Sequence, residues 1–362
     1  MRRLALLATL GCTLLSTAVL AQSSFNNLII FGDSLSDIGN NTWSTAPGKV
    51  GTPITNTLPN HTQPIWVNTV SQTLFPNKTL YHSSNLPKNM DPNTLNIDWS
   101  WAAAETGSNY INDDTHHSPP PYNDTACNPH GPGRMAPGNS CVPGTELQIN
   151  EYLTAVHHQP SPNTLFIIWA GGNDLFNDIS KLLPSGQPIN DGHLNLLIDS
   201  VHEHPQRSLY TPFSVPLSTP VKNLNDAVTT LEAQGINPNQ IYVINLPDLS
   251  KTPAAQAMAK GNKLILDAVS MISYLYDLDL ELDLSKLIPK SHVISIADLF
   301  NDMTTHPAPY KLTNVTNSCV ADHKTPSCTG YLFFNSKHPT IHTHQLIAQY
   351  ILTHLYQGAT HV

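Results

Sequence analysis

The sequence is short of charged residues, and this shortage limits what the protein can bind. Only 12% of its 362 residues are Asp, Glu, Lys or Arg, which is about half of the usual share. The charge that is present is mostly acidic, with 17 basic against 26 acidic residues and a net charge of −9. This balance argues against nucleic-acid binding and provides no electrostatic attraction to an anionic membrane.

Long apolar stretches are also missing after Leu20, so no later segment is expected to span a bilayer. Before it, Arg2 and Arg3 precede an apolar stretch that begins at Leu4, and Ala21 closes a small-residue cleavage site. This order is typical of a secretory signal peptide. We therefore predict a secreted or periplasmic protein in which residues 1–21 are removed. Residues 22–362 then form a single domain, whose net charge is −11 because two arginines are lost.

Cysteines are few, and none forms a Cys-x-x-Cys pair, which argues against a zinc ribbon or a redox motif. Four remain after the signal peptide: Cys127, Cys141, Cys319 and Cys328. An even number at short spacings is typical of an oxidising compartment. Three pairings are open, and we favour Cys127–Cys141 with Cys319–Cys328 because each closes a local, polar, turn-rich loop. We predict no metal site.

Short apolar runs rich in β-branched residues predict strands that are covered on both faces. They are Leu28–Phe31, Leu165–Ala170, Ile241–Ile244 and Val293–Ile296. Helical patterns alternate with them at Leu147–Val156, Val221–Ala233, Pro253 to about Leu282, and Ile341–Leu355. The alternation predicts an α/β fold with a mostly parallel sheet wrapped by helices on both faces, in which ligands bind beyond the carboxyl ends of the strands.

Two polar stretches interrupt this rhythm. Residues 107–145 and residues 301–334 are rich in turn-forming and polar residues, and each holds one of the favoured cysteine pairs. We interpret both as ordered insertions near the site, with roles as lids or as targets of a processing protease. Residues 184–220 have weak periodicity and receive no assignment.

Polar residues with catalytic potential follow two of the predicted strands. Gly32-Asp33-Ser34 comes directly after the first strand, which exposes the serine at the edge of the sheet. Gly171-Gly172-Asn173-Asp174 follows the second strand, where the Asn173 amide is able to donate to a developing oxyanion. Alone, each string also fits an ordinary capped turn.

A third candidate lies near the end of the chain. His338 precedes the last predicted helix and follows a cluster of aromatic residues, which suits a general base facing the site. The chain has 18 histidines, so one histidine alone says little. His342 and His344 are interpreted as solvated or structural, and as reserve metal ligands only.

Taken together and in this order, the segments around Ser34, Asn173 and His338 resemble the signature blocks of the GDSL (SGNH) hydrolases. The resemblance implies a three-layer α/β/α sandwich, no cofactor, Ser34 as nucleophile and His338 as base. It implies an oxyanion hole formed by the Ser34 amide, the Asn173 side chain and the Ala104 backbone amide. Ala104 is placed by a weak match of Ser100–Gly107 to the family's second block, with Gly107 as the alternative. Gly32, Asp33, Gly171 and Asp174 are assigned supporting positions.

The sequence departs from the family at Asn335, where an aspartate normally orients the base. In the serine-protease case the same change lowers turnover by about 10⁴. Three explanations stay open: a Ser34–His338 dyad oriented by a backbone carbonyl, which we favour; a carboxylate elsewhere, such as Asp322; or a weakened enzyme that binds more than it turns over.

The resemblance is greatest to exported lysophospholipases, lipases and glycerophospholipid–cholesterol acyltransferases. It implies a lipid or other small ester as the substrate, transient contact with a membrane surface, and no nucleic-acid partner. The alternatives are a catalytically weakened binding protein and a carbohydrate O-acetyl esterase. Trp43, Trp66 and Trp101 are candidates for lining an acyl groove, although large aromatic residues more often lie in the core.

Overall fold

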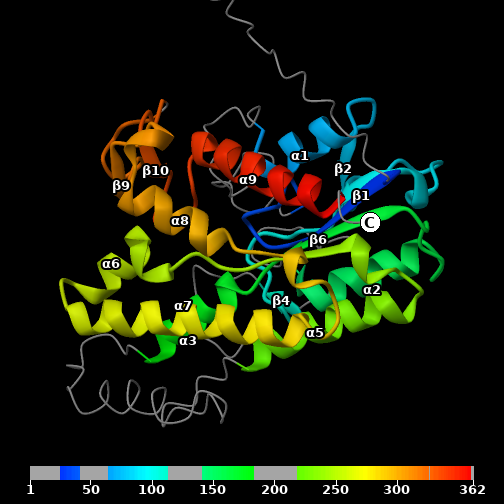
Figure 1. The fold of residues 1–362 in the computed structure, drawn as a ribbon, viewed down its shortest axis with the longest axis horizontal. Coiled ribbons are helices and arrows are strands. Elements are labelled where there is room, and N and C mark those ends of the chain that lie inside the picture. Colours follow the sequence, from blue (N-terminus) through cyan, green and yellow to red (C-terminus); the bar gives the residue numbers. More distant parts are fainter. Residues whose placement is uncertain (1–24, 41–63, 113–140, 183–217, 326, 360–362) are drawn as a thin grey trace, which may run out of the picture.

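The computed structural model describes residues 25–40, 64–112, 141–182, 218–325 and 327–359. At their centre lies a parallel sheet of six strands in the order β2-β3-β1-β6-β7-β8 (Figure 1). The strands are β1 Asn27–Gly32, β2 Leu80–His82, β3 Asn96–Asp98, β6 Thr164–Trp169, β7 Ile241–Ile244 and β8 Val293–Ile294. The predicted parallel sheet is confirmed.

The two central strands form the middle of the core. Every residue of β1 and of β6 is buried, and the pair runs in register from Asn27 opposite Thr164 to Gly32 opposite Trp169. A strand that is apolar on both faces has to be covered on both faces, which explains why the sequence alternates strands with helices.

Helices cover both faces of the sheet and complete a three-layer α/β/α sandwich (Figure 1). One face is covered by α1 (Trp66–Leu74) and α9 (Ile341–Ala359), which pack against each other. The other is covered by α2 (Thr145–Ala155), α5 (Ser218–Ala233) and α7 (Lys263–Leu284), with α3 (Gly172–Leu182) packed on α7. The fold class implied by the sequence motifs is confirmed.

Shorter elements complete the described chain. They are the helices α6 Pro253–Ala259 and α8 Ile296–Thr305, the parallel pair β9 Asn314–Ser318 and β10 Tyr331–Phe333, and the antiparallel pair β4 Tyr110–Asn112 and β5 Cys141–Pro143. None of the described helices combines the length and apolar character needed to cross a membrane. The predicted signal peptide, Trp43 and most of residues 107–145 and 184–220 lie outside the described residues.

The single long helix expected from Pro253 to about Leu282 is wrong. The chain breaks after α6 because Lys260 and Gly261 adopt left-handed conformations, with φ of 48° and 83°. Asn262 then begins α7 by accepting a hydrogen bond from the Leu264 N–H at 3.0 Å. The apolar residues on both sides of the break keep helical spacing, so periodicity alone does not reveal it.

The last predicted strand is also too long. β8 ends at Ile294, because the Ser295 hydroxyl accepts from the Asp298 N–H and starts α8 with Ile296. The serine acts as a helix N-cap, a role that removes it and Ile296 from the strand.

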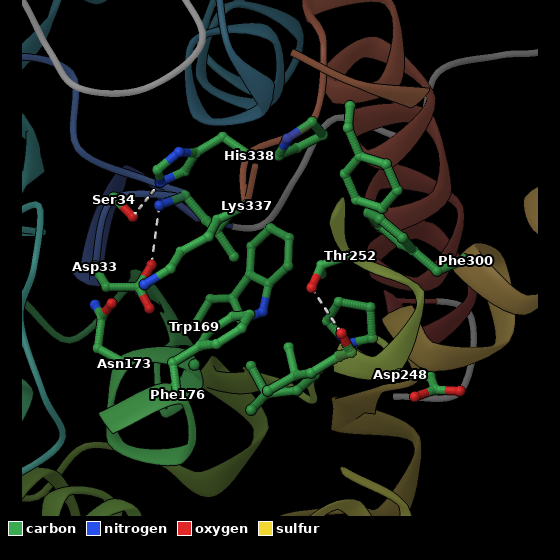
Figure 2. Close-up of a pocket in the computed structure, with 17 residues that line it drawn as sticks. Asp33, Ser34, Trp169, Asn173, Phe176, Asp248, Thr252, Phe300, Lys337 and His338 are labelled. Carbon is green, nitrogen blue, oxygen red and sulfur yellow. Dashed lines mark hydrogen bonds between the residues drawn. The ribbon is translucent and has the colours of Figure 1, made fainter. Parts of the chain in front are cut away.

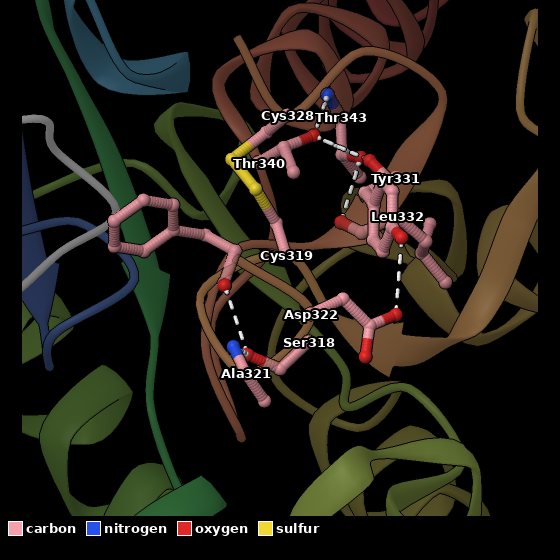
Figure 3. Close-up of a disulfide and its surroundings, with 10 residues drawn as sticks. Ser318, Cys319, Ala321, Asp322, Cys328, Tyr331, Leu332, Thr340 and Thr343 are labelled. Atoms are coloured by element: carbon pink, nitrogen blue, oxygen red, sulfur yellow. Dashed lines mark hydrogen bonds between the residues drawn. A yellow bond between two sulfur atoms is a disulfide. The ribbon is translucent and has the colours of Figure 1, made fainter. Parts of the chain in front are cut away.

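Within the insertion at residues 301–334, the predicted Cys319–Cys328 disulfide is present (Figure 3). Backbone bonds tie this loop to the strand that leads into the His338 segment. The Cys319 N–H donates to the Phe333 carbonyl at 3.0 Å, and the Val320 N–H donates to the Phe334 carbonyl at 2.9 Å. The Cys127–Cys141 pairing cannot be placed in the same way, because Cys127 lies outside the described residues.

We expect replacement of both Cys319 and Cys328 by alanine to lower the free energy of unfolding by about 2–4 kcal/mol. The bridge closes a loop with a sequence separation of 9 residues, and Cys319 is fully buried. Chemical denaturation of the double variant, compared with the parent protein, measures the loss. An unchanged midpoint and slope would contradict a stabilising role for this bridge.

Candidate active site

Ser34 lies just beyond the carboxyl end of β1, on a loop that the backbone holds closely against β6. A Cβ atom at Gly32 would come within 2.2 Å of the Trp169 carbonyl oxygen, so no larger residue fits between the strands. The Asp33 carbonyl accepts from the Ser36 and Asp37 N–H groups, and the Asp33 carboxylate accepts from the Leu35 N–H at 2.9 Å. These bonds hold the loop in place, and Ser34, which is 8% exposed, lines the cleft.

Asp37 joins this loop to the segment that follows β3. One of its carboxylate oxygens accepts from the Gly39 and Asn40 N–H groups, and the other accepts from the Ala102 N–H at 2.8 Å. Asp33 and Asp37 therefore brace the loop.

Asn173 lies in the first turn of α3, shortly after the end of β6. The turn before it requires glycine, because Gly171 has φ of 110° and a Cβ there would lie 2.3 Å from the Tyr276 hydroxyl oxygen. The Asn173 side-chain amide donates to the Ala104 carbonyl at 2.9 Å, which fixes its orientation. Asp174 points away and accepts from the N–H and hydroxyl of Thr106. Asp174 therefore supports the segment that follows β3.

His338 meets Ser34 although 304 positions separate them in the chain. The distance between His338 Nε2 and Ser34 Oγ is 2.7 Å (Figure 2). The His338 carbonyl accepts from the Phe334 N–H at 2.8 Å, and the Thr340 N–H donates to the Leu332 carbonyl. The turn that holds His338 is thereby attached to β10, and through it to the disulfide loop.

Asn335 occupies the place of the usual aspartate and contacts the other ring nitrogen. Its Oδ1 lies 3.0 Å from His338 Nδ1, and it also accepts from the backbone N–H groups of Lys337 at 2.9 Å and His338 at 2.8 Å. Two fixed backbone donors require an oxygen at this position, because a side-chain NH₂ group would face them donor to donor. The oxygen therefore accepts the Nδ1–H, which leaves Nε2 unprotonated and able to accept the Ser34 proton.

This contact bears on two of the three explanations left open by the sequence. The structure contradicts a backbone carbonyl as the group that orients the ring, because the partner of Nδ1 is the Asn335 side chain. Asp322 does not replace it, since its carboxylate accepts from the Asn317 amide. The same carboxylate accepts from the Tyr331 hydroxyl (Figure 3). The site is a Ser–His pair oriented by a neutral amide.

We expect Asn335→Asp to raise kcat by about tenfold and to raise the pKa of His338. The existing amide already selects the required tautomer, so the new carboxylate adds only the difference between a charged and a neutral acceptor, about 1–2 kcal/mol. Steady-state kinetics across pH measure both effects. A gain of 10³ or more would show that the amide does not hold the tautomer inferred above, and Asn335→Ala, which removes the acceptor, is expected to lose activity.

Burial sets the protonation state of the base. Desolvation and, to a lesser degree, the positive charge of Lys337 together lower the pKa of His338 to about 4. The imidazole is therefore neutral at neutral pH, which is the form a general base requires.

We expect kcat/KM to rise with pH through about 4 and to be level at neutral pH. Protonation of His338 removes the base, so activity is lost as the pH falls through its pKa in the free protein. Rates of hydrolysis measured between pH 3 and pH 8, at ester concentrations below saturation, show the pH at which kcat/KM falls. A limb near the ordinary histidine value of 6.5 would show that burial does not govern this group.

The structure contradicts the expected role of Ala104 as an oxyanion donor. Its backbone N–H donates to the Trp101 carbonyl at 3.0 Å, across a turn in which Ala103 has φ of 72°. The alternative, Gly107, packs against Gly144 and is not among the residues that line the cleft. Two of the expected donors remain: the Asn173 amide, and the Ser34 N–H, which donates no backbone hydrogen bond among the described residues.

An apolar cleft extends from Ser34 along the carboxyl edge of the sheet (Figure 2). It encloses ≈ 620 Å³ of empty space, part of it open to solvent. Its aromatic walls come from β6, α3, α8 and β10, namely Trp169, Phe176, Phe300 and Phe333. Of the tryptophans proposed from the sequence, Trp43 lies outside the described residues, and Trp66 and Trp101 do not line the cleft. Trp66 is fully buried and donates to the Leu35 carbonyl, and Trp101 packs with Ala104 and Val142.

No group of three or more candidate metal ligands occurs among the described residues. His342 Nε2 bonds the Tyr310 carbonyl at 2.8 Å. His344 is fully buried in α9, and burial lowers its pKa to about 3. Both histidines are structural parts of the described chain, as the sequence suggests.

No family model matches the chain, and no curated protein matches it in sequence. Similar solved structures include an α/β hydrolase, LAE5, from the metagenome of Lake Arreo, Spain, with 11% identity, coverage of 92% of this chain and 96% of that chain, and a TM-score of 0.41. A catalytic mutant of the acetylxylan esterase Axe2 from Geobacillus stearothermophilus has 10% identity, coverage of 92% and 95%, and a TM-score of 0.40. The acetyl xylan esterase AlAXEase has 8% identity, coverage of 90% of this chain and 98% of that chain, and a TM-score of 0.36.

The fold and the paired side chains define this protein as an α/β/α sandwich with a serine–histidine site at the carboxyl edge of its parallel sheet. Each of the three motifs contributes a residue to that site. The α/β/α sandwich agrees with the fold that the resemblance of the sequence motifs to the GDSL (SGNH) hydrolases implies.

Proposed function

We propose that this protein is a serine ester hydrolase that acts through an acyl-enzyme on Ser34. The observation that carries the proposal is the 2.7 Å contact between Ser34 Oγ and His338 Nε2 at the head of an apolar cleft. A hydroxyl bonded to the unprotonated nitrogen of an oriented imidazole is the arrangement that activates a serine for attack on a carbonyl carbon.

The geometry supports the following sequence of steps. His338 Nε2 accepts the hydroxyl proton as Ser34 Oγ attacks the ester carbonyl, and the tetrahedral oxyanion is stabilised by the Ser34 N–H and the Asn173 amide. The intermediate collapses, and the imidazolium gives its proton to the departing alkoxide. Water then repeats the cycle on the acyl-enzyme, with His338 as base and then as acid. Asn335 holds the Nδ1–H throughout.

The lining of the cleft favours a hydrocarbon acyl group. Beyond the Ser34–His338 pair its walls are mostly aromatic and aliphatic side chains, with Leu246, Leu249 and Pro339 beside the four aromatic residues. Burial of each CH₂ group against such walls is worth about 0.8 kcal/mol. We therefore propose a lipid ester, of the lysophospholipid or acylglycerol type, as the substrate. Transfer of the acyl group to another alcohol differs only in the acceptor.

The chemistry is tested by a fluorophosphonate probe, which forms a covalent bond with an activated serine. We expect the parent protein to be labelled and Ser34→Ala not to be labelled. Ser36→Ala is the matched control, because Ser36 is buried two residues away and its hydroxyl has no partner among the described residues. A folded parent protein that remains unlabelled would favour the weakened binding protein over an enzyme.

The substrate class is tested by p-nitrophenyl esters of increasing acyl length. We expect kcat/KM to rise from acetyl to medium-chain esters, because each added CH₂ enters the apolar cleft. A preference for acetyl esters would instead favour a carbohydrate O-acetyl esterase. Phe300→Ala, at the far wall of the cleft, is expected to move the preference towards longer chains. An unaltered preference would place the acyl chain elsewhere.

A further inference from the structure

The side chain of Gln148 pairs with the end of the strand that leads to the nucleophile. Gln148 lies on α2, is fully buried and comes 116 positions after Gly32. Its Oε1 accepts from the Gly32 N–H at 3.0 Å. Its Nε2 donates to the Gly32 carbonyl at 2.9 Å and to the Pro143 carbonyl at 3.0 Å. The carboxamide thus uses both its acceptor and its donors on backbone groups.

This pairing occurs where β1 loses its neighbouring strand. β3 ends at Asp98, which lies opposite Ile30, and does not reach Gly32. Beyond that point the Gly32 carbonyl accepts from the Trp101 N–H at 3.1 Å. A buried backbone N–H also requires an acceptor, because an unpaired one is costly. Gln148 supplies an acceptor and a donor in one planar group, as a further strand residue would do.

The helix that carries Gln148 is itself attached to the segment beside Asn173. At the start of α2, the Glu146 N–H donates to the Thr106 carbonyl at 3.1 Å. The Thr106 hydroxyl in turn donates to the carboxylate of Asp174, the residue after Asn173, at 2.7 Å. Through this helix, Gln148 connects the end of β1 with the segment that supports the oxyanion donor.

We propose that Gln148 is a positioning residue, which fixes Gly32 and thereby places the hydroxyl of Ser34. The inference rests on the proposed ester hydrolysis and concerns the same site. Ser34 follows Gly32 by two positions, so a displaced Gly32 carries the serine with it. The hydroxyl lies 2.7 Å from His338 Nε2, and this contact has to be kept for the proton to pass. A misplacement of about 1 Å at a reacting group costs up to about 10²-fold in rate.

The chain contains a matched control for this role. Gln240 is 9% exposed, and its Oε1 accepts from the Asn237 N–H at 3.1 Å. Its Nε2 donates to the carbonyls of Pro162 at 2.8 Å and Thr164 at 2.9 Å. This amide holds the amino end of β6, whereas the site lies at the carboxyl end of the sheet. The two glutamines make the same kinds of bonds, but only Gln148 makes them beside the nucleophile.

The test compares Gln148→Met with Gln240→Met, because methionine keeps the length of the side chain and removes its hydrogen bonds. We expect Gln148→Met to lower kcat for a p-nitrophenyl ester, and the rate of fluorophosphonate labelling, by about 10²-fold. KM should stay within a few-fold, because Gln148 does not line the cleft. Gln240→Met should keep kcat within a few-fold, with a similar fall in its thermal midpoint. An unchanged kcat in Gln148→Met, or equal losses of kcat in the two variants, would show that Gln148 only supports the fold.

Gln148→Glu gives a second measurement, which decides the matter if Gln148→Met does not fold. The neutral acid still accepts from the Gly32 N–H and donates one hydrogen, whereas the carboxylate faces the carbonyl oxygens of Gly32 and Pro143. Burial raises the pKa of such a carboxyl, so the neutral form is the one present at low pH. We expect the kcat of this variant, divided by that of the parent at the same pH, to fall between pH 5 and pH 9. The ratio for Gln240→Glu should stay level, and a level ratio near one for Gln148→Glu would contradict the proposal.

A structural readout separates this inference from the proposed function. The ¹⁵N signal of His338 Nε2, assigned by its loss in His338→Ala, reports whether that nitrogen accepts a hydrogen bond from Ser34. We expect Gln148→Met to shift this signal to the position of an unbonded nitrogen, and Gln240→Met to leave it in place. If the parent protein hydrolyses no ester, ester hydrolysis fails as the function, while this signal still decides whether Gln148 places Ser34. An unchanged signal in Gln148→Met would overturn the proposal.

Discussion

Replacing His338 by alanine is expected to lower kcat/KM for an ester by about 10⁴–10⁶, with little change in KM. The imidazole is the only group that bonds the Ser34 hydroxyl in the described chain, at 2.7 Å, and without it the serine proton has no acceptor. The effect should equal that of Ser34→Ala, and the double variant should lose no more than either single one, because the two side chains act as a unit.

His342→Ala provides the matched control for this experiment. His342 lies on the first turn of α9, and its Nε2 contacts the Tyr310 carbonyl outside the cleft. We expect this variant to keep activity within a few-fold of the parent, with circular dichroism and thermal unfolding reporting the fold of both variants. Retention of one tenth or more of the parent activity by His338→Ala would mean that another base serves Ser34.

Replacing Asn173 by alanine is expected to lower kcat by about 10²–10³ and to leave KM within a few-fold. The Asn173 amide uses one hydrogen for the Ala104 carbonyl, at 2.9 Å, and its second hydrogen is available to an oxyanion above Ser34. The effect should be large because the structure leaves few donors, since the Ala104 N–H already bonds the Trp101 carbonyl.

A second substitution, Asn173→Asp, tests whether the Asn173 side chain acts by donating to the oxyanion. It keeps the shape of the side chain, removes the donor and adds negative charge where the oxyanion forms, so its loss of kcat should exceed that of Asn173→Ala. If Asn173→Asp retains more activity than Asn173→Ala, the side chain acts through the fold and not through the oxyanion. Equal thermal midpoints for the variants and the parent would exclude unfolding as the cause of either loss.

The central strands and the positions of Ser34, Asn173 and His338 could be predicted from the sequence because short-range patterns encode them. A fully buried strand is an unbroken apolar run, and β1 and β6 show such runs. A polar residue directly after such a strand lies at the carboxyl edge of a parallel sheet, where neighbouring strands bring their loops together.

The helix break at Lys260 and the early end of β8 could not be predicted in the same way. Each depends on one local hydrogen bond, accepted by the Asn262 or the Ser295 side chain, that competes with an apolar pattern running through the same segment. The aromatic residues of the cleft were missed because a buried tryptophan or phenylalanine looks the same in a sequence whether it faces the core or a cavity. Trp169 and Phe176 lie close to the Asn173 motif in the sequence, and this closeness is the one signal that could have indicated them.

By itself the sequence indicated which side chains are the candidates for the chemistry, because strand ends, turn glycines and motif order are local properties of the chain. Only the tertiary structure decided how those side chains are used. Whether the Asn335 amide presents oxygen or nitrogen to His338 depends on two backbone N–H groups, and whether the Ala104 amide is free depends on the turn at Ala103. Hydrogen-bond direction and burial arise from atoms that meet in space, so residue identity alone does not specify them.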